Sequence, residues 1–509
     1  MMFYDYPNLV RLLERTVARN GNSAALRIEE RTISYFEFWN LAEKFAAGLL
    51  SKNIQPGDRV AVLLPNIPEF VISYYGAQMA GAVVVPINNQ FKYQEIQFIL
   101  EDSESKFVVF SENLQNEISG VLNQHDPRLT AIIFKKSSSG DFINWDDFLS
   151  QQTSFVPIHR VDPGKPAVIL YTSGTTGRPR GVVLSHQNLS SNALACEESG
   201  AVTPHDICLG VLPFYHSFGQ TAVMNNCIAS GALNVMMPKF DPKEVLQTLR
   251  ENEITIFAAV PTMFKMLLDY QKEPVQLSSV RICLSGGAKL DVNVYREFKE
   301  KFGLHIYEGY GLTEAAPVVS FNPMDYRSKV GSVGLPLSGI KVKIVDEEDH
   351  ELTPGHAGEI VIEGPNVMQG YLNRPEATKE VLRDGKLYTG DIGTFDDDGY
   401  IFILDRKGDL IIKGGFNVYP KEVEQVITYH PKVKDVAVIG VPDPVQGEEV
   451  KAYISLKPGK RVSKKEIFEY CKEHLANYKC PKYITFLHTL PKSSAGKILK
   501  RKLYIQKSK

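Results

Sequence analysis

Short apolar runs alternate with helix-patterned segments between residues 59 and 284, and this alternation limits the possible folds more than any other feature. The run Arg59 to Leu64 is followed by a helical stretch, Glu69 to Ala80, and then by a second run, Ala82 to Ile87. Glycine and proline bound these runs, as is typical of buried strands. Similar runs recur at residues 106–110, 131–134, 207–212, 232–236, 256–259 and 281–284. Repeated strand, helix, strand units predict an α/β fold whose parallel sheets carry helices on both faces.

The pattern changes twice after Val330. The next apolar runs are short, rich in β-branched residues and separated by Gly, Asp and Pro, which predicts a small antiparallel unit. From Tyr419 onward, helix and strand patterns predict a small α+β domain. The charged, glycine-bearing stretch from Asp405 to Asp409 lies between these regions. Because 509 residues exceed what one hydrophobic core usually supports, we expect two domains, residues 1–405 and 406–509.

The stretch from Thr172 to Gly181 has the composition of a phosphate-binding loop. It contains Ser173, Gly174, Thr175, Thr176 and Gly177 and lies between the apolar runs 167–170 and 182–184. Hydroxyls and glycines in a tight turn allow backbone N–H groups to converge on an anion, and Arg180 adds a fixed positive charge. The pattern G-x-x-x-x-G-K-[ST] of P-loop NTPases is absent. The alternative interpretation is a hairpin that binds no ligand.

Composition excludes several classes of function. The chain has 57 basic and 59 acidic residues, so no global field directs it to nucleic acid or to a lipid surface. Its six cysteines form no C-x-x-C pair, which argues against structural zinc and fits a reducing compartment. The first twenty residues lack the apolar core of a secretory signal, and no apolar run approaches the roughly 20 residues of a membrane span. We therefore expect a cytoplasmic protein without nucleic acid partners.

Four further stretches carry residues suited to nucleotide chemistry. The small residues from Ser285 to Ala288 follow an apolar strand and allow a flat ligand to approach the backbone. The stretch from Tyr307 to Glu314 combines glycines, aromatic rings, a hydroxyl and a carboxylate, which suits a base, a phosphate and Mg²⁺. Asp391 follows a tight turn and can accept hydrogen bonds from ribose, and Lys497 lies in a loop almost at the C-terminus.

In order and spacing, these motifs resemble the adenylate-forming superfamily of acyl-CoA synthetases, nonribosomal adenylation domains and luciferases, with fatty acid–CoA ligases most similar. The resemblance covers essentially the whole chain. It implies a large N-terminal domain of two βαβ subdomains plus a small β-barrel, followed by a mobile C-terminal lid. It also implies that ATP and Mg²⁺ activate a small carboxylic acid as acyl-AMP, which a thiol then converts to a thioester.

The resemblance also implies roles for individual residues. The nucleotide is expected to contact Thr172, Ser173, Gly174, Thr175, Thr176, Gly177, Arg180, Gly286, Gly287, Ala288, Glu308, Gly309, Tyr310, Gly311, Thr313, Asp391, Arg406 and Lys497. Glu314, together with Thr172, is expected to position Mg²⁺. The expected catalytic residues are Lys497, His216, Glu314 and Thr313. The other expected sets are the acyl pocket (Tyr215, His216, Phe218 and Met224), the hinge (Asp405 and Gly408) and the thiol tunnel (Gly414 and Gly415). A packed or capping role is the alternative for His216.

The chain departs from the family pattern at several positions. Arg180 stands where lysine is usual, so the charge is kept but the donor geometry differs. Gly408 replaces a common acidic or lysine residue at the hinge. Gln446 and Cys480 stand where some CoA-using relatives have an aromatic residue and an arginine, which leaves Lys479 and Lys482 as candidate contacts of the CoA nucleotide. Transfer to the phosphopantetheine of an acyl carrier protein is therefore an alternative to transfer to CoA.

The aromatic residues around His216 predict an apolar pocket, with no charged residue aimed at a substrate amino group. A fatty or aryl acid is therefore favoured over an amino acid. Two other functions stay open at this point. A regulator that binds nucleotide without catalysis would be expected to lack Lys497 or Glu314, and both are present. An oxygenase of the luciferase kind shares the same adenylation chemistry.

Overall fold

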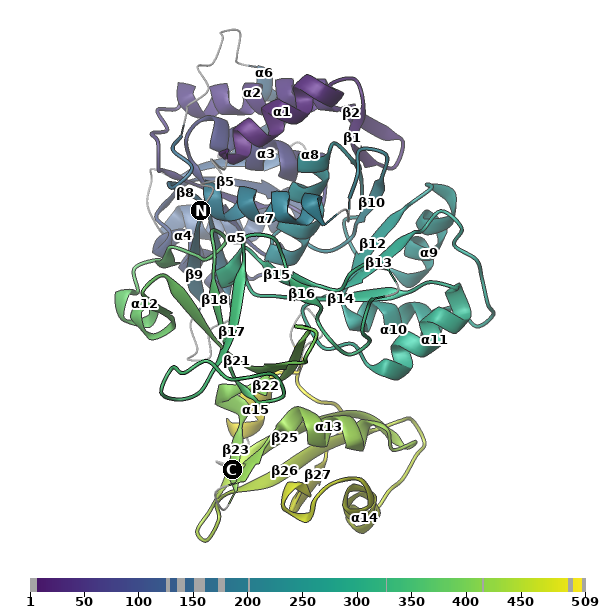
Figure 1. Cartoon of the computed structure of the whole chain (residues 1–509). Helices are drawn as coiled ribbons and strands as arrows, with labels where there is room; N and C mark the ends of the chain where they lie inside the picture. The colour runs from purple at the N-terminus through teal and green to yellow at the C-terminus, as the bar shows by residue number, and fades with distance from the viewer. Residues whose placement is uncertain are drawn as a thin grey trace. The chain divides into compact units, whose positions relative to one another are not determined.

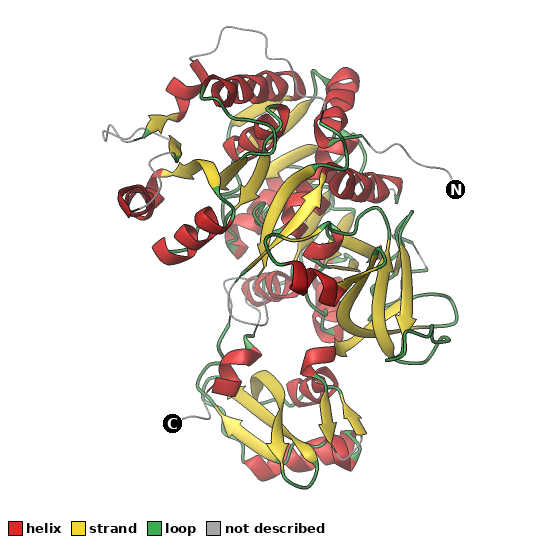
Figure 2. Ribbon diagram, turned by 90° about the vertical axis from the view of Figure 1, so that its left-hand side faces the viewer, coloured by secondary structure: helices red, strands yellow, loops and turns green. Residues whose placement is uncertain are grey.

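The computed structural model describes residues 7–124, 129–134, 142–150, 161–172, 179–199, 202–325, 327–413, 416–492 and 498–505. These residues form two compact units. Unit 1 runs to Val342 and also includes Ile362–Leu387, whereas unit 2 consists of Lys343–Val361 and the chain from Tyr388 onward. Figures 1 and 2 show strands flanked by helices within unit 1, as the sequence predicts.

The first sheet of unit 1 carries both ends of the predicted phosphate loop near one edge. Over the described ranges its order is β19-β9-β8-β4-β3-β5-β6-β7. The strands are β3 (Arg59–Leu63), β4 (Val83–Pro86), β5 (Ser105–Ser111), β6 (Thr130–Phe134), β7 (Ile143–Asn144), β8 (Pro166–Thr172), β9 (Arg180–Ser185) and β19 (Gly370–Tyr371). The strands from β8 to β7 pair in parallel, while β9 is antiparallel to both β8 and β19. The predicted parallel sheet therefore ends in an antiparallel edge.

The second sheet of unit 1 has the order β16-β15-β14-β13-β12-β10-β11-β1-β2 in the described part of the chain. Its strands are β1 (Ala24–Ile28), β2 (Arg31–Ser34), β10 (Ile207–Gly210), β11 (Leu233–Met236), β12 (Ile256–Ala259), β13 (Ile282–Ser285), β14 (Ile306–Gly311), β15 (Val318–Phe321) and β16 (Leu335–Pro336). The central strands pair in parallel. One face packs Leu209 and Phe257 against Leu249, Phe264 and Phe298 of the neighbouring helices, which Figure 1 shows beside β12 and β13.

The helices of unit 1 cover both sheets. They are α1 (Leu9–Asn20), α2 (Tyr35–Ser51), α3 (Pro68–Met79), α4 (Tyr93–Asp102), α5 (Gln115–Gln124), α6 (Trp145–Ser150), α7 (His186–Glu198), α8 (Asn226–Ser230), α9 (Pro242–Glu251), α10 (Pro261–Tyr270), α11 (Val292–Phe302) and α12 (Pro375–Val381). Every residue of α3 is buried, as expected for a helix that is covered on all sides. The predicted helix at residues 69–80 and the strands around it are thus confirmed within one residue or two.

Unit 2 contains most of a small antiparallel sheet and an α+β domain. The first sheet includes β17 (Lys341–Val345), β18 (Gly358–Glu363), β21 (Lys386–Phe395) and β22 (Ile401–Arg406), and β20 (Leu382–Arg383) precedes β21. The second contains β23 (Ile411–Lys413), β24 (Phe416–Val418), β25 (Val433–Asp443), β26 (Gly447–Leu456) and β27 (Tyr483–Phe486), together with α13 (Pro420–Thr428), α14 (Lys464–His474) and α15 (Lys500–Ile505). The predicted α/β class with a separate C-terminal region is confirmed. The boundary at residue 405 lies inside unit 2 and stays a prediction.

Candidate nucleotide and acyl site

The two ends of the predicted phosphate loop lie side by side in unit 1. Thr172 ends β8 and Arg180 begins β9, and the two residues are direct partners in the antiparallel ladder. The two ends of the predicted loop are thus held next to each other in the ladder of β8 and β9. Five of the predicted loop residues lie outside the described residues, namely Ser173, Gly174, Thr175, Thr176 and Gly177. Their contacts with phosphate stay predictions.

A tyrosine that sequence reasoning missed stands between Arg180 and Glu314. The hydroxyl of Tyr371 donates a hydrogen bond of 2.9 Å to Oε1 of Glu314. The guanidinium carbon of Arg180 lies 5.4 Å from the centroid of the same ring. Burial and the negative charge of Glu314 raise the pKa of Tyr371 far above its ordinary range, although Arg180 opposes the shift. The phenol therefore stays protonated and acts as a hydrogen-bond donor.

The turn that carries Thr313 and Glu314 follows directly after β14. It is a short 3₁₀ turn, η3 (Thr313–Ala315), and the oxygen of Thr313 lies 3.1 Å from Oγ of Ser217. Ser217 is buried and was not predicted as a site residue. It precedes the helix that bears the predicted acyl residue Phe218. The structure thus brings the predicted acyl and phosphate segments into direct contact.

The donor atoms of the two predicted Mg²⁺ ligands suit this ion. Glu314 offers a carboxylate and Thr172 a hydroxyl, and hard divalent cations prefer oxygen donors. The hydrogen bond from Tyr371 occupies one of the roughly four lone-pair positions of the carboxylate, so most of its acceptor capacity remains. These residues fit the metal that the sequence predicts.

The predicted adenine loop follows β13, where Gly286 is buried and Gly287 and Ala288 are exposed. A Cβ atom at Gly286 would lie 3.2 Å from two ring carbons of Phe218, so glycine provides the space in which that ring lies. Gly287 has a φ of 79°, which favours glycine at this turn. The adenine loop and the acyl segment are therefore packed against each other.

The buried carboxylate of Glu308 holds the backbone just after this loop, at Leu290. The side chain is buried, and its two carboxylate oxygens accept hydrogen bonds from the backbone N–H groups of Leu290 (3.2 Å) and Gly331 (3.3 Å). Burial raises the pKa of Glu308 to about 7, while the two amides and Lys289 act in the opposite direction. The carboxylate is thus directed at the protein backbone, which gives Glu308 a positioning function.

The rest of the predicted adenine segment is a strand. Gly309 and Tyr310 belong to β14 and pair with Phe321 and Ser320 of β15, and Gly311 ends the strand. All three are only partly buried, so they remain accessible to a ligand.

The predicted acyl residues lie in or directly before a π-helix, η2 (Phe218–Asn225): Phe218 and Met224 belong to it, and Tyr215 and His216 precede it. His216 is exposed, and its Nδ1 accepts a 3.3 Å hydrogen bond from the backbone N–H of Phe218, which places the proton of the neutral ring on Nε2. Tyr215 is half-buried, and this burial raises its pKa. Met224 is fully buried within η2. Short π-helical segments are frequent at functional sites.

The polar side chains of η2 form a buried layer with α3. Oδ1 of Asn225 accepts a hydrogen bond of 3.0 Å from the hydroxyl of Tyr75, and Gln220 donates one of 3.2 Å to the carbonyl of Phe214. Gln220 and Asn225 are fully buried. The helix that carries Phe218 thus also contributes polar side chains to the interior.

Within unit 2, the predicted nucleotide contacts Asp391 and Arg406 are paired with each other. Asp391 and Arg406 are partners in the ladder of β21 and β22, and Nε of Arg406 lies 2.9 Å from Oδ1 of Asp391.

The predicted hinge residue Asp405 is buried and accepts hydrogen bonds of 2.8 Å from the N–H groups of Arg406 and Lys421. A Cβ atom at Gly408 would meet nothing within 4 Å. Gly414, Gly415 and Lys497 lie outside the described residues, so their roles stay predictions.

The candidate CoA contacts in unit 2 are paired with acidic side chains. Lys479 lies 2.7 Å from Glu422, and Lys482 lies 2.9 Å from Asp443. Lys482 and two backbone amides lower the pKa of Asp443 to about 2. Cys480 is buried, and its thiol faces the carbonyl of Ala476 at 3.7 Å.

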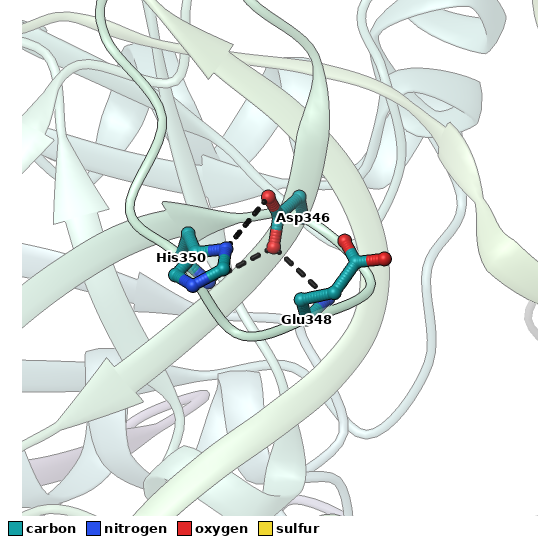
Figure 3. Close-up of side chains that lie close together, drawn as sticks. All are labelled: Asp346, Glu348 and His350. Carbon is teal, nitrogen blue, oxygen red and sulfur yellow. Dashed lines mark hydrogen bonds and ion pairs between the residues drawn. The ribbon is translucent and has the colours of Figure 1, made fainter.

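A group of possible cation ligands also lies in unit 2, where the donor atoms of Asp346, Glu348 and His350 are within 4.8 Å of one another (Figure 3). The carboxylate of Asp346 accepts hydrogen bonds of 2.9 Å from the backbone N–H groups of Glu348 and His350. Asp346 also donates its own N–H to the carbonyl of His350. The cluster is therefore explained by the hydrogen bonds of a tight turn.

Two mostly parallel sheets with helices on both faces, loop ends that meet at Thr172 and Arg180, and the carboxylate turn at Glu314 define a nucleotide-binding α/β enzyme. Residues 13–372 match the AMP-binding enzyme family, and residues 422–497 match the AMP-binding enzyme C-terminal domain. The chain therefore belongs to this family of adenylate-forming enzymes. By this membership it is an AMP-forming acid–thiol ligase.

Relatives and solved structures match the chain over nearly its whole length. A long-chain-fatty-acid–CoA ligase of Bacillus subtilis (strain 168) is 38% identical and covers 97% of this chain and 93% of its own. A feruloyl-CoA synthase of Amycolatopsis sp is 34% identical and covers 96% of both. The crystal structure of ATP-bound MatB from Rhodopseudomonas palustris has a TM-score of 0.90 and 33% identity, and covers 98% of this chain and 99% of its own. In the described part of this chain, no helix has the length and apolar character needed to cross a bilayer.

Proposed function

We propose that this protein activates a fatty or aryl carboxylic acid as acyl-AMP, releases pyrophosphate and transfers the acyl group to CoA. The contact between Ser217 and Thr313 carries the proposal, because it joins the predicted acyl segment to the predicted phosphate turn. An acid held at one segment would lie next to a nucleotide held at the other. Relatives named as CoA ligases for a fatty acid and for an aryl acid support the same chemistry.

The residues of unit 1 suit the first half-reaction. A carboxylate is a poor electrophile, so the acid attacks the α-phosphate and pyrophosphate leaves. Both partners are anionic, and such reactions depend on positioning and on positive charge. Arg180 supplies a guanidinium at the loop that would hold the leaving pyrophosphate. Glu314 and Thr172 would hold Mg²⁺, which neutralises phosphate charge when bound.

Two residues of unit 2 are proposed to bind the ribose. The pair Asp391 and Arg406 presents a carboxylate that can accept hydrogen bonds from ribose hydroxyls, and its partner guanidinium fixes the orientation of that carboxylate. We assign Lys497 to the substrate carboxylate and the α-phosphate. Rotation at Asp405 and Gly408 would withdraw this lysine and present Gly414 and Gly415 to the thiol, so that domain motion separates the two half-reactions.

CoA is the proposed acceptor, and it would meet a lysine pair that is already partly neutralised. Lys479 and Lys482 can contact phosphates of the CoA nucleotide, but Glu422 and Asp443 compensate their charge. We therefore expect the pantetheine arm to supply most of the recognition. An acyl carrier protein offers the same arm without the adenosine and is the competing acceptor.

Product analysis separates these acceptors. The enzyme is supplied with ATP, Mg²⁺ and a panel of fatty, aryl and amino acids, together with either CoA or a phosphopantetheinylated carrier protein. Mass spectrometry should detect acyl-CoA from one class of fatty or aryl acid. Acylation of the carrier protein alone would replace CoA as the acceptor. Pyrophosphate release without any thioester would refute the ligase proposal.

The role of Lys497 has its own test. Lys497→Ala should abolish formation of acyl-AMP but retain thioester formation from preformed acyl-AMP. Lys492→Ala is the matched control, because Lys492 lies in the same segment and pairs with Asp435 at 2.9 Å. Equal loss of both half-reactions in Lys497→Ala would contradict the assignment.

A further inference from the structure

Tyr371 connects two parts of the site that are distant in sequence. It lies 57 residues from Glu314, the carboxylate that receives its hydroxyl hydrogen bond. Its ring also faces the guanidinium of Arg180, whose centre is 5.4 Å from the ring centroid. One side chain thus touches both the cation at the phosphate loop and the carboxylate expected to hold the metal.

The backbone around Tyr371 is fixed on several sides. Its own N–H donates to Oγ1 of Thr378 at 2.9 Å, and β19 pairs with β9 directly after Arg180. Leu372 donates its N–H to the carbonyl of Gly181 at 2.7 Å, while Met368 donates to the carbonyl of Glu314 at 2.9 Å. The segment is therefore anchored to the strand that follows the loop and to the turn that bears the carboxylate.

This arrangement would hold Glu314 in one orientation. A glutamate side chain has several rotatable bonds, and it loses conformational entropy when it binds a cation. A donor already placed at Oε1 fixes the carboxylate plane and leaves Oε2 to face a ligand. Residues that hydrogen-bond to metal-binding carboxylates typically change metal affinity or activity by about 10-fold to 100-fold when they are mutated.

We propose that Tyr371 is a positioning residue for metal-bound ATP: its hydroxyl orients Glu314, and its ring supports Arg180 at the phosphate loop. This inference rests on the proposed function for its metal and nucleotide. It assigns separate tasks to the two halves of one side chain. Removal of the hydroxyl should lower the affinity for the metal ion. Removal of the ring should also weaken the contact between Arg180 and phosphate.

The test measures metal binding directly. Mn²⁺ is titrated into enzyme and ATP without any acid, and free Mn²⁺ is followed by electron paramagnetic resonance. Tyr371→Phe keeps the ring and should weaken Mn²⁺ binding about 10-fold, with less than about a threefold change in ATP affinity at saturating metal. Tyr371→Leu should weaken the binding of both Mn²⁺ and ATP.

The control is a second tyrosine that binds a carboxylate. Tyr171 donates a 2.8 Å hydrogen bond to Asp102, which is paired with Arg374. Tyr171→Phe therefore removes the same kind of bond and should leave Mn²⁺ affinity at the wild-type value. Equal weakening by Tyr171→Phe and Tyr371→Phe, or no weakening by Tyr371→Phe, would overturn the inference.

A double variant separates orientation of Glu314 from general loss of structure. If Tyr371 acts through Glu314, Tyr371→Phe should have no further effect on Mn²⁺ binding in a Glu314→Gln background. An added loss of the same size in that background would overturn the inference. Because no acid is present, a Tyr371-dependent Mn²⁺ signal would stand even if every acid failed as a substrate, so the two proposals fail separately.

Discussion

The hydroxyl of Ser217 lies 3.1 Å from that of Thr313, so the segment expected to hold the acid touches the turn expected to hold the phosphates. Ser217→Ala removes this hydrogen bond, and a single hydrogen bond contributes about 1 kcal/mol, which corresponds to about fivefold in rate. We expect kcat/KM for the acid to fall by about that factor in a pyrophosphate-release assay. The matched control is Ser191→Ala, which removes a buried serine bonded within α7. An equal decrease in the control would contradict this account.

Substitutions of Arg180 test whether this residue contacts the phosphates of ATP. Arg180→Lys keeps the positive charge but loses the planar fork of donors, and a hydrogen bond to a charged group contributes about 1.5–3 kcal/mol. We expect KM for ATP to rise about tenfold in Arg180→Lys and further in Arg180→Ala. KM for the acid should change less in both variants. An unchanged KM for ATP in Arg180→Ala would show that this residue does not contact the nucleotide.

The raised pKa of Glu308 predicts that the stability of the protein depends on pH. Its pKa is about 7 in the folded protein and close to 4.5 in the unfolded chain. Because the folded pKa is the higher one, the contribution of Glu308 to stability is complete below about pH 4.5 and is lost as the pH rises through about 7. The Tm of the wild type, compared with that of Glu308→Gln, should therefore fall between pH 5 and pH 8. A pH-independent difference between the two proteins would contradict the assignment.

Gly286 links the adenine loop to the acyl segment. In Gly286→Ala the new methyl group would lie 3.2 Å from the ring of Phe218, which must move by a few tenths of an ångström. Overpacking of this kind costs about 1–3 kcal/mol. We expect a higher KM for the acid, which the second substitution F218L should partly restore. If the double variant does not improve on Gly286→Ala, the contact between Gly286 and Phe218 does not affect binding of the acid, and the prediction is wrong.

The sequence predicts much of the fold because its signals are local. The strands β3 and β4 and the helix α3 follow from apolar runs bounded by Gly and Pro, and Asp391 and Arg406 meet because their strands are neighbours. Tyr371 and Ser217 could not be predicted in the same way. Each acquires its role through a partner distant in sequence, 57 residues away for Tyr371 and 96 for Ser217. Their positions depend on tertiary packing, which a local motif does not encode.

The π-helix η2 is a second feature that the sequence pattern does not reveal. Its residues are nearly all buried, so apolar periodicity gives no signal for the wider turn. Several of these buried residues are polar, and Gln220 and Asn225 form hydrogen bonds within the interior. The apolar pocket that the aromatic residues near His216 predict stays a prediction.

Exchange of labelled pyrophosphate into ATP tests the central claim most directly. Formation of acyl-AMP is reversible, so exchange should require the correct acid and Mg²⁺ but no CoA. We predict acid-dependent exchange with a fatty or aryl acid, and its loss in Glu314→Gln and Lys497→Ala. No exchange with any acid, or exchange that needs no acid, would contradict the assignment of this protein as an enzyme that proceeds through acyl-AMP.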